Sequence, residues 1–169
     1  IYALKDTGNA AYVIENNGTI EFSDDSASIN NDSNVGIYTN GENNKVKTAS
    51  GSKIETKARS IGIYGYEVEN DGDITVGDKG SAIYTQGGNV NITSGTINVG
   101  KNEAVGIYSA GSSQVITNNA TAMNIDEGSF GFANVGTGNT INSNVANVNL
   151  KDNSIYIYSK NAGTVNNVT

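Results

Sequence analysis

Short stretches in which apolar and polar residues alternate follow one another along this chain. The clearest are residues 90–92, 97–99 and 105–108, which are separated by turn-forming residues at 94–95 and 100–102. Alternation with a period of two is typical of a short strand with one buried face, and Gly, Ser and Asn between such runs indicate turns. We therefore predict three short strands and three turns within one repeat of about 24 residues.

The last strand of this unit recurs along the chain and ends in Tyr or in a substitute for it. The residues at that place are Tyr12, Tyr38, Tyr64, Tyr84, Tyr108, Ala133 and Tyr158. Their numbers differ by 26, 26, 20, 24, 25 and 25. A repeat with a period of about 20 to 50 residues is typical of solenoids, in which each unit buries its apolar face against its neighbours.

Three strands in every repeat predict an all-β fold, namely a three-sided parallel β-helix with about 24 residues per coil and about six to seven coils. No segment keeps the 3.6-residue period of a helix, and the many β-branched, Gly and Asn residues disfavour one. The 169 residues suffice for a single domain, 1–169, with one continuous core. In the first coil Ile14 and residues 20–22 fit the pattern, whereas residues 23–34 exceed the length of a turn and are expected to protrude as a loop.

The recurring strand also predicts which side chains face the core. Its third residue should point inward and stack along the axis, at Ile37, Ile63, Ile83, Ile107, Phe132 and Ile157. We expect the first residue to join this core and the second, usually Gly, to face outward and ease a bend. A further Gly follows the Tyr at 41, 87, 111 and 136, with Asn161 in the last coil, and these positions indicate turns with positive φ.

Two outward columns are expected to be ladders of like side chains. Asn98, Asn124 and Asn149 should exchange amide hydrogen bonds at strand spacing. The tyrosines should form an outer aromatic ladder that seals one coil to the next, with a gap at Ala133. As an alternative, Tyr38, Tyr64, Tyr84 and Tyr108 are a candidate platform for sugar rings or protein side chains.

The charges are unevenly distributed in a chain whose net charge is −7. One coil holds half of the ten basic residues: Lys45, Lys47, Lys53, Lys57 and Arg59. Glu67 and Glu69 stand one repeat after Lys45 and Lys47, which predicts cross-strand pairs of opposite sign. The alternative is a binding stripe for an anionic glycan. Asp24, Asp25 and Asp32 place a second candidate ligand surface on the expected loop at 23–34.

The composition also excludes several kinds of chemistry. The chain has no His and no Cys, so Ser-His-Asp and Cys-His catalytic sets, the usual zinc ligands and disulfides are impossible. Its acidic balance disfavours nucleic acid as a partner, and no apolar run reaches the about 18 residues of a membrane span. We predict no metal and no cofactor. Neighbouring carboxylates, among them Asp71 with Asp73 and Asp126 with Glu127, keep a polysaccharide-active β-helix enzyme as an alternative to a non-enzyme.

Residues 95–111 carry the motif Gly-Thr-Ile-Asn-Val-Gly, then Val-Gly-Ile-Tyr, then Gly. This unit resembles the passenger repeats of large type V autotransporter adhesins of Gram-negative bacteria, especially fusobacterial outer-membrane adhesins, over residues 10–160. The resemblance implies a right-handed parallel β-helix displayed outside the cell by a C-terminal membrane barrel. The absence of Cys agrees with this implication, because disulfides would hinder export of an unfolded chain through the barrel. The family has no catalytic residues to transfer.

Three functional hypotheses follow from the fold, the carboxylates and the resemblance. The first is a rod segment of a cell-surface adhesin that contacts a protein or glycan on host or bacterial cells. The chain opens within an Ile-Tyr phrase and ends without a polar cap, so we expect a fragment continued by further coils at both ends. The other hypotheses are a fragment of a polysaccharide-active enzyme and a pure structural spacer of a fibre.

Overall fold

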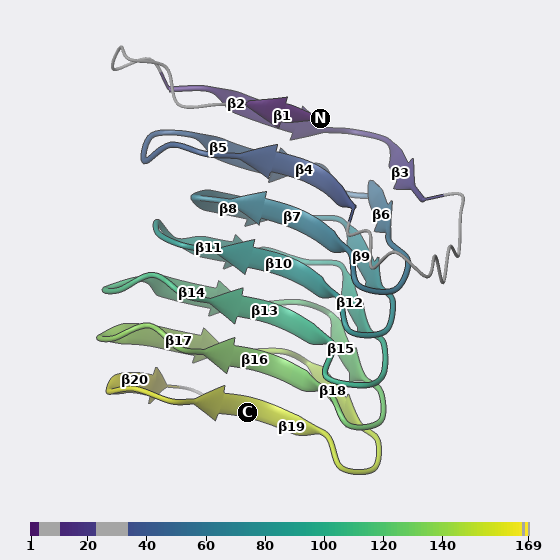
Figure 1. The fold of residues 1–169 in the computed structure, drawn as a ribbon, viewed down its shortest axis with the longest axis vertical. Helices are drawn as coiled ribbons and strands as arrows, with labels where there is room; N and C mark the ends of the chain where they lie inside the picture. The colour runs from purple at the N-terminus through teal and green to yellow at the C-terminus, as the bar shows by residue number, and fades with distance from the viewer. Residues whose placement is uncertain (4–10, 23–33, 167, 169) are drawn as a thin grey trace.

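The computed structural model describes residues 1–3, 11–22, 34–166 and 168. These residues form twenty short strands and no helix, so none of them lies in a helix long and apolar enough to cross a membrane. Every strand pairs in parallel with strands of the neighbouring coils, and the coils lie one above another in a stack (Figure 1). The described chain is therefore a three-sided parallel β-helix, as predicted.

Three sheets, named A, B and C, make the three sides. Sheet A consists of β1 (Tyr2–Ala3), β4 (Val35–Thr39), β7 (Ile61–Gly65), β10 (Ser81–Thr85), β13 (Val105–Ser109), β16 (Phe130–Asn134) and β19 (Ile155–Ser159). Sheet B consists of β2 (Val13–Asn16), β5 (Lys45–Thr48), β8 (Glu67–Asn70), β11 (Val90–Ile92), β14 (Val115–Asn118), β17 (Asn139–Ser143) and β20 (Gly163–Asn166). Sheet C consists of β3 (Thr19–Glu21), β6 (Lys53–Glu55), β9 (Asp73–Val76), β12 (Thr96–Val99), β15 (Ala122–Ile125) and β18 (Asn147–Leu150).

The core is a set of branched side chains that stack along the axis from all three sheets. The predicted inward residues of sheet A are fully buried at Ile37, Ile63, Ile83, Ile107 and Phe132, while Ile157 is partly buried. Sheet B contributes Val46, Val68, Val90, Ile116 and Ile141, and sheet C contributes Ile54, Ile74, Ile97 and Met123. Branched residues suit this pleated, buried surface, so the composition and the fold agree.

The first coil differs from the prediction in its register. Tyr2, and not Tyr12, pairs with Tyr38 in sheet A. Tyr12 stands just before β2, where its backbone N–H donates to Asn44 Oδ1 over 3.1 Å. The backbone of Tyr2 therefore continues the sheet A register in place of Tyr12. Residues 23–33 of the predicted protruding loop lie outside the described residues.

The prediction for the first two residues of the repeated phrase was wrong. Gly36, Gly62, Gly106 and Gly131 are buried, and the first residue is only half-buried in most coils. A Cβ on Gly62 would lie 2.7 Å from the carbonyl oxygen of Ala82 and 3.3 Å from Ile74 Cγ2. In coils that another described coil follows, the second residue thus faces the core and must be small, because the next coil and sheet C leave no room there. Tyr156 occupies this place in the last described coil.

The position that follows each Tyr also requires glycine for a different reason from the expected one. Of the four, only Gly41 has a positive φ. A Cβ on Gly136 would overlap the carbonyl oxygen of Gly111 in the coil before it. Close approach between coils, rather than left-handed backbone, excludes side chains at that place.

Candidate functional site

The predicted aromatic ladder is present on sheet A. Ring centroids of Tyr38, Tyr64, Tyr84 and Tyr108 lie 4.8, 5.1 and 4.9 Å apart in succession, with interplanar angles of 21°, 8° and 8°. The parallel register pairs these residues directly, so the rings repeat at about the spacing of strands. Ala133 interrupts the ladder as expected. The ring of Tyr158 packs edge-on against Phe130 instead, at 5.9 Å.

Stacking determines which part of each ring a partner can reach. The two faces of Tyr64 are covered by Tyr38 and Tyr84, so only the ring edge and the hydroxyl face solvent. Burial, followed by the neighbouring Tyr38 and Tyr84, raises the pKa of the Tyr64 phenol. The inner rings of the ladder consequently offer no open aromatic face to a sugar, and their geometry is that of a seal between coils.

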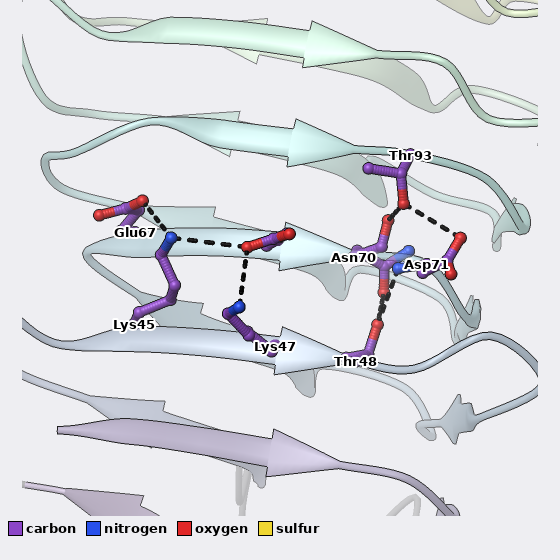
Figure 2. A network of polar contacts seen from close by, with 8 residues as sticks. Lys45, Lys47, Thr48, Glu67, Asn70, Asp71 and Thr93 are labelled. Atoms are coloured by element: carbon purple, nitrogen blue, oxygen red, sulfur yellow. Dashed lines mark hydrogen bonds and ion pairs between the residues drawn. The ribbon is translucent and has the colours of Figure 1, made fainter.

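The predicted pairs of opposite charge lie on the outer face of sheet B, between β5 and β8. Lys45 Nζ is 2.7 Å from Glu67 Oε1 and 3.5 Å from Glu69 Oε2, and Lys47 Nζ is 3.5 Å from the same Glu69 oxygen (Figure 2). The hydrogen bond to Glu67 is the main cause that raises the pKa of Lys45. The predicted cross-strand pairs of opposite charge are therefore present.

The structure does not bring the five basic residues of this coil together. Lys53 belongs to β6 on sheet C, where it pairs in register with Asp73. Lys57 and Arg59 follow β6 in the turn toward sheet A. The corner between sheets B and C separates them from Lys45 and Lys47, so the described residues form no single basic stripe. Asp24, Asp25 and Asp32 lie outside the described residues.

The predicted amide ladder is confirmed on sheet C. Asn124 Nδ2 donates to Asn98 Oδ1, and Asn149 Nδ2 donates to Asn124 Oδ1, each over 2.7 Å. A second polar column, which the sequence analysis did not identify, runs along the end of sheet B. There the hydroxyl of Thr48 donates to Asn70 Oδ1 over 2.6 Å (Figure 2). These side chains satisfy one another between coils.

The neighbouring carboxylates also have structural partners. Asp71 Oδ1 accepts hydrogen bonds from Thr93 and Ser94, and Asp73 Oδ1 accepts the backbone N–H of Thr96. The backbone N–H of Glu127 is the main cause that lowers the pKa of Asp126, with Lys151 contributing. No group of three or more acidic side chains among the described residues is close enough to hold a metal ion.

The sequence analysis did not predict a recess that lies at one corner of the described coils. It has a volume of about 210 Å³ and lies at the corner between β7 and β8, and its lining residues are Thr39, Asn40, Gly41, Glu42, Tyr64, Gly65, Tyr66 and Gln86. The signal that could have found it is the interval of 20 residues between Tyr64 and Tyr84, the shortest of the series. A coil with fewer residues must leave space where its neighbours have a loop.

Three parallel sheets wound into stacked coils define the chain as a β-solenoid of the three-sided β-helix class. No family model, no curated protein and no solved structure matches it.

Proposed function

We propose that this chain is a rod segment of a bacterial cell-surface adhesin, displayed from the outer membrane for contact with host cells or other bacteria. The partner is a protein or glycan of those surfaces. The resemblance of residues 95–111 to autotransporter passenger repeats supports this proposal, and the β-helix is the fold which that resemblance implies. Further coils of the parent chain would extend the rod at both ends.

The observation that carries the proposal is the use of outward side chains to join coils. The tyrosine stack on sheet A, the amide ladder on sheet C and the ion pairs on sheet B each connect successive coils. Such columns stiffen a rod along its axis, because each coil contacts only its neighbours. A rod that keeps a binding surface at a distance from a cell needs this stiffness.

Binding of the labelled chain to cultured host cells and to bacterial cells tests the proposal. We expect saturable binding to at least one of them. The Tyr38/Tyr64/Tyr84→Phe variant keeps the ring stack and removes three hydroxyls, so it should bind equally if the ladder is a seal. Circular dichroism checks that both proteins have the same β content.

Two results would replace the proposal by its alternatives. A correctly folded chain that binds neither kind of cell would favour the structural spacer. Release of reducing ends from a polysaccharide panel would favour the enzyme. Asp71 and Asp73 give no support to that alternative, because both accept structural hydrogen bonds.

A further inference from the structure

The coil between β7 and β10 is shortened mainly at one corner. A single residue, Tyr66, connects β7 to β8, whereas residues 40–44 make the same connection in the coil before and residues 86–89 in the coil after. The neighbouring loops therefore extend beyond the shortened corner and enclose the recess described above, which we call the corner notch. Figure 1 shows this corner at the end of β7 and β8.

Tyr66 occupies the side of the corner notch that adjoins the following coil. A Cβ on Gly87 would overlap the Tyr66 ring, and a Cβ on Gly88 would lie 2.6 Å from its Cδ1 atom. The ring thus rests on the backbone of these two glycines, and it also lines the notch together with residues 40–42. In contrast to Tyr64, whose faces are covered within the ladder, Tyr66 is partly exposed and stacks on no other aromatic ring among the described residues.

Thr39 is one of the residues that line the corner notch, and its side chain is buried. The residue is 1% exposed, and its Oγ1 has no hydrogen-bond partner among the described residues. In the same column Gly65 has no side chain, while Thr85 Oγ1 donates to the carbonyl of Gly87 over 2.6 Å. A buried hydroxyl without a partner costs free energy, and a ligand hydroxyl that reaches it after a small shift of the wall would recover that cost.

We infer that the corner notch binds one neutral pyranose ring, an assignment that rests on the proposed adhesive role. A pyranose has an apolar C–H face, which suits the Tyr66 ring, and a rim of hydroxyls. The rim would meet the amides of Asn40 and Gln86, the carboxylate of Glu42 and the hydroxyl of Thr39. The volume of about 210 Å³ is below the range of about 300 to 1,000 Å³ for drug-sized ligands, so a single ring is the unit that fits.

Titration of the isotope-labelled chain with the methyl glycosides of glucose, galactose and mannose, followed by amide NMR shifts, tests the assignment. We expect at least one glycoside to shift residues 39–42, 64–66 and 86 selectively, with a Kd of about 1 mM. Tyr66→Ala should abolish these shifts, and Tyr66→Phe should retain them.

Thr39→Val has a matched control in this chain. Thr56 is equally without a partner and is 5% exposed, but it does not line the notch. Both valine variants remove an unpaired buried hydroxyl, so both should keep or raise the melting temperature. Only Thr39→Val should weaken glycoside binding, by about fivefold or more, which is the loss of one modest hydrogen bond.

Two outcomes would overturn the assignment. One is the absence of selective shifts at about 100 mM of every glycoside, roughly a hundred times a weak Kd. The other is an equal loss of affinity in Thr39→Val and Thr56→Val. Cell binding separates the two proposals: if the chain binds cells but no glycoside, the notch assignment fails alone, and if it binds glycosides but no cells, the adhesive role fails alone.

Discussion

At the residue scale, the position of a side chain in this fold is decided by the residues one coil away. Ile107 lies between Ile83 and Phe132 in the sheet A column, and Gly106 packs under the carbonyl oxygen of Gly131. A branched residue fits the first of these places and only a very small residue fits the second. The two neighbours in sequence therefore have opposite size requirements.

Ile107→Ala should lower the free energy of unfolding by about 2 to 5 kcal/mol, because it removes fully buried methyl groups and leaves a cavity. Ile107→Val is the control and should cost only about 0.5 to 1.5 kcal/mol. Urea unfolding followed by circular dichroism measures both. Equal losses in the two variants would contradict the stacked core.

At the element scale, no strand of three to five residues is stable by itself, and the columns between strands specify the register. The β5–β8 pair shows this with charge, since Lys45 faces Glu67 and Lys47 faces Glu69. A shift of β8 that places Glu67 opposite Lys47 would keep the alternation of buried and outward residues but would leave Lys45 opposite Gly65, with no carboxylate directly across. These ion pairs contribute little to the free energy of unfolding, and their effect is to favour one register of β8 against β5.

A double-mutant cycle of Lys45→Met and Glu67→Gln should give a coupling energy of about 0.2 to 1 kcal/mol that falls at high salt. The pKa of Lys45 is raised in the folded chain above its ordinary value of 10.5. The coupling is therefore complete below about pH 10.5 and is lost as the pH rises through the folded pKa. Urea unfolding at two salt concentrations measures it. A coupling that salt leaves unchanged would contradict this account.

At the scale of the whole molecule, the described coils differ in how well neighbours cover them. In the last coil Leu150 and Ile155 are 50% and 43% exposed, while the corresponding residues of inner coils, Val99 and Val105, are buried. A solenoid behaves approximately as a one-dimensional chain of neighbour contacts, so its local stability follows this coverage.

In the isolated 169-residue chain, amide hydrogen exchange should accordingly be slowest in β10 and β13 and become faster toward β19 and β20. The reason is that the central strands have a coil on each side, whereas the described residues place none beyond the last coil. Exchange detected by mass spectrometry over minutes to hours measures the gradient. Uniform protection from β10 to β20 would show a single cooperative unit instead.

The sequence alone determined the class of fold and most of its columns. The reason is that period-two strands and a repeat of about 24 residues leave few other ways to bury the apolar side chains. The tyrosine stack, the amide ladder and the Lys45–Glu67 pair follow directly, since each lies one repeat from its partner.

The features that depend on packing between neighbouring coils were determined only by the tertiary structure. It showed Gly62 facing the core, because packing against Ile74 and the next coil is invisible in the alternation of a single strand. It placed the backbone of Tyr2, and not that of Tyr12, beside Tyr38 in sheet A. It also showed that the irregular interval of 20 residues corresponds to the corner notch, because a shortened corner forms a recess only when longer loops lie on both sides of it.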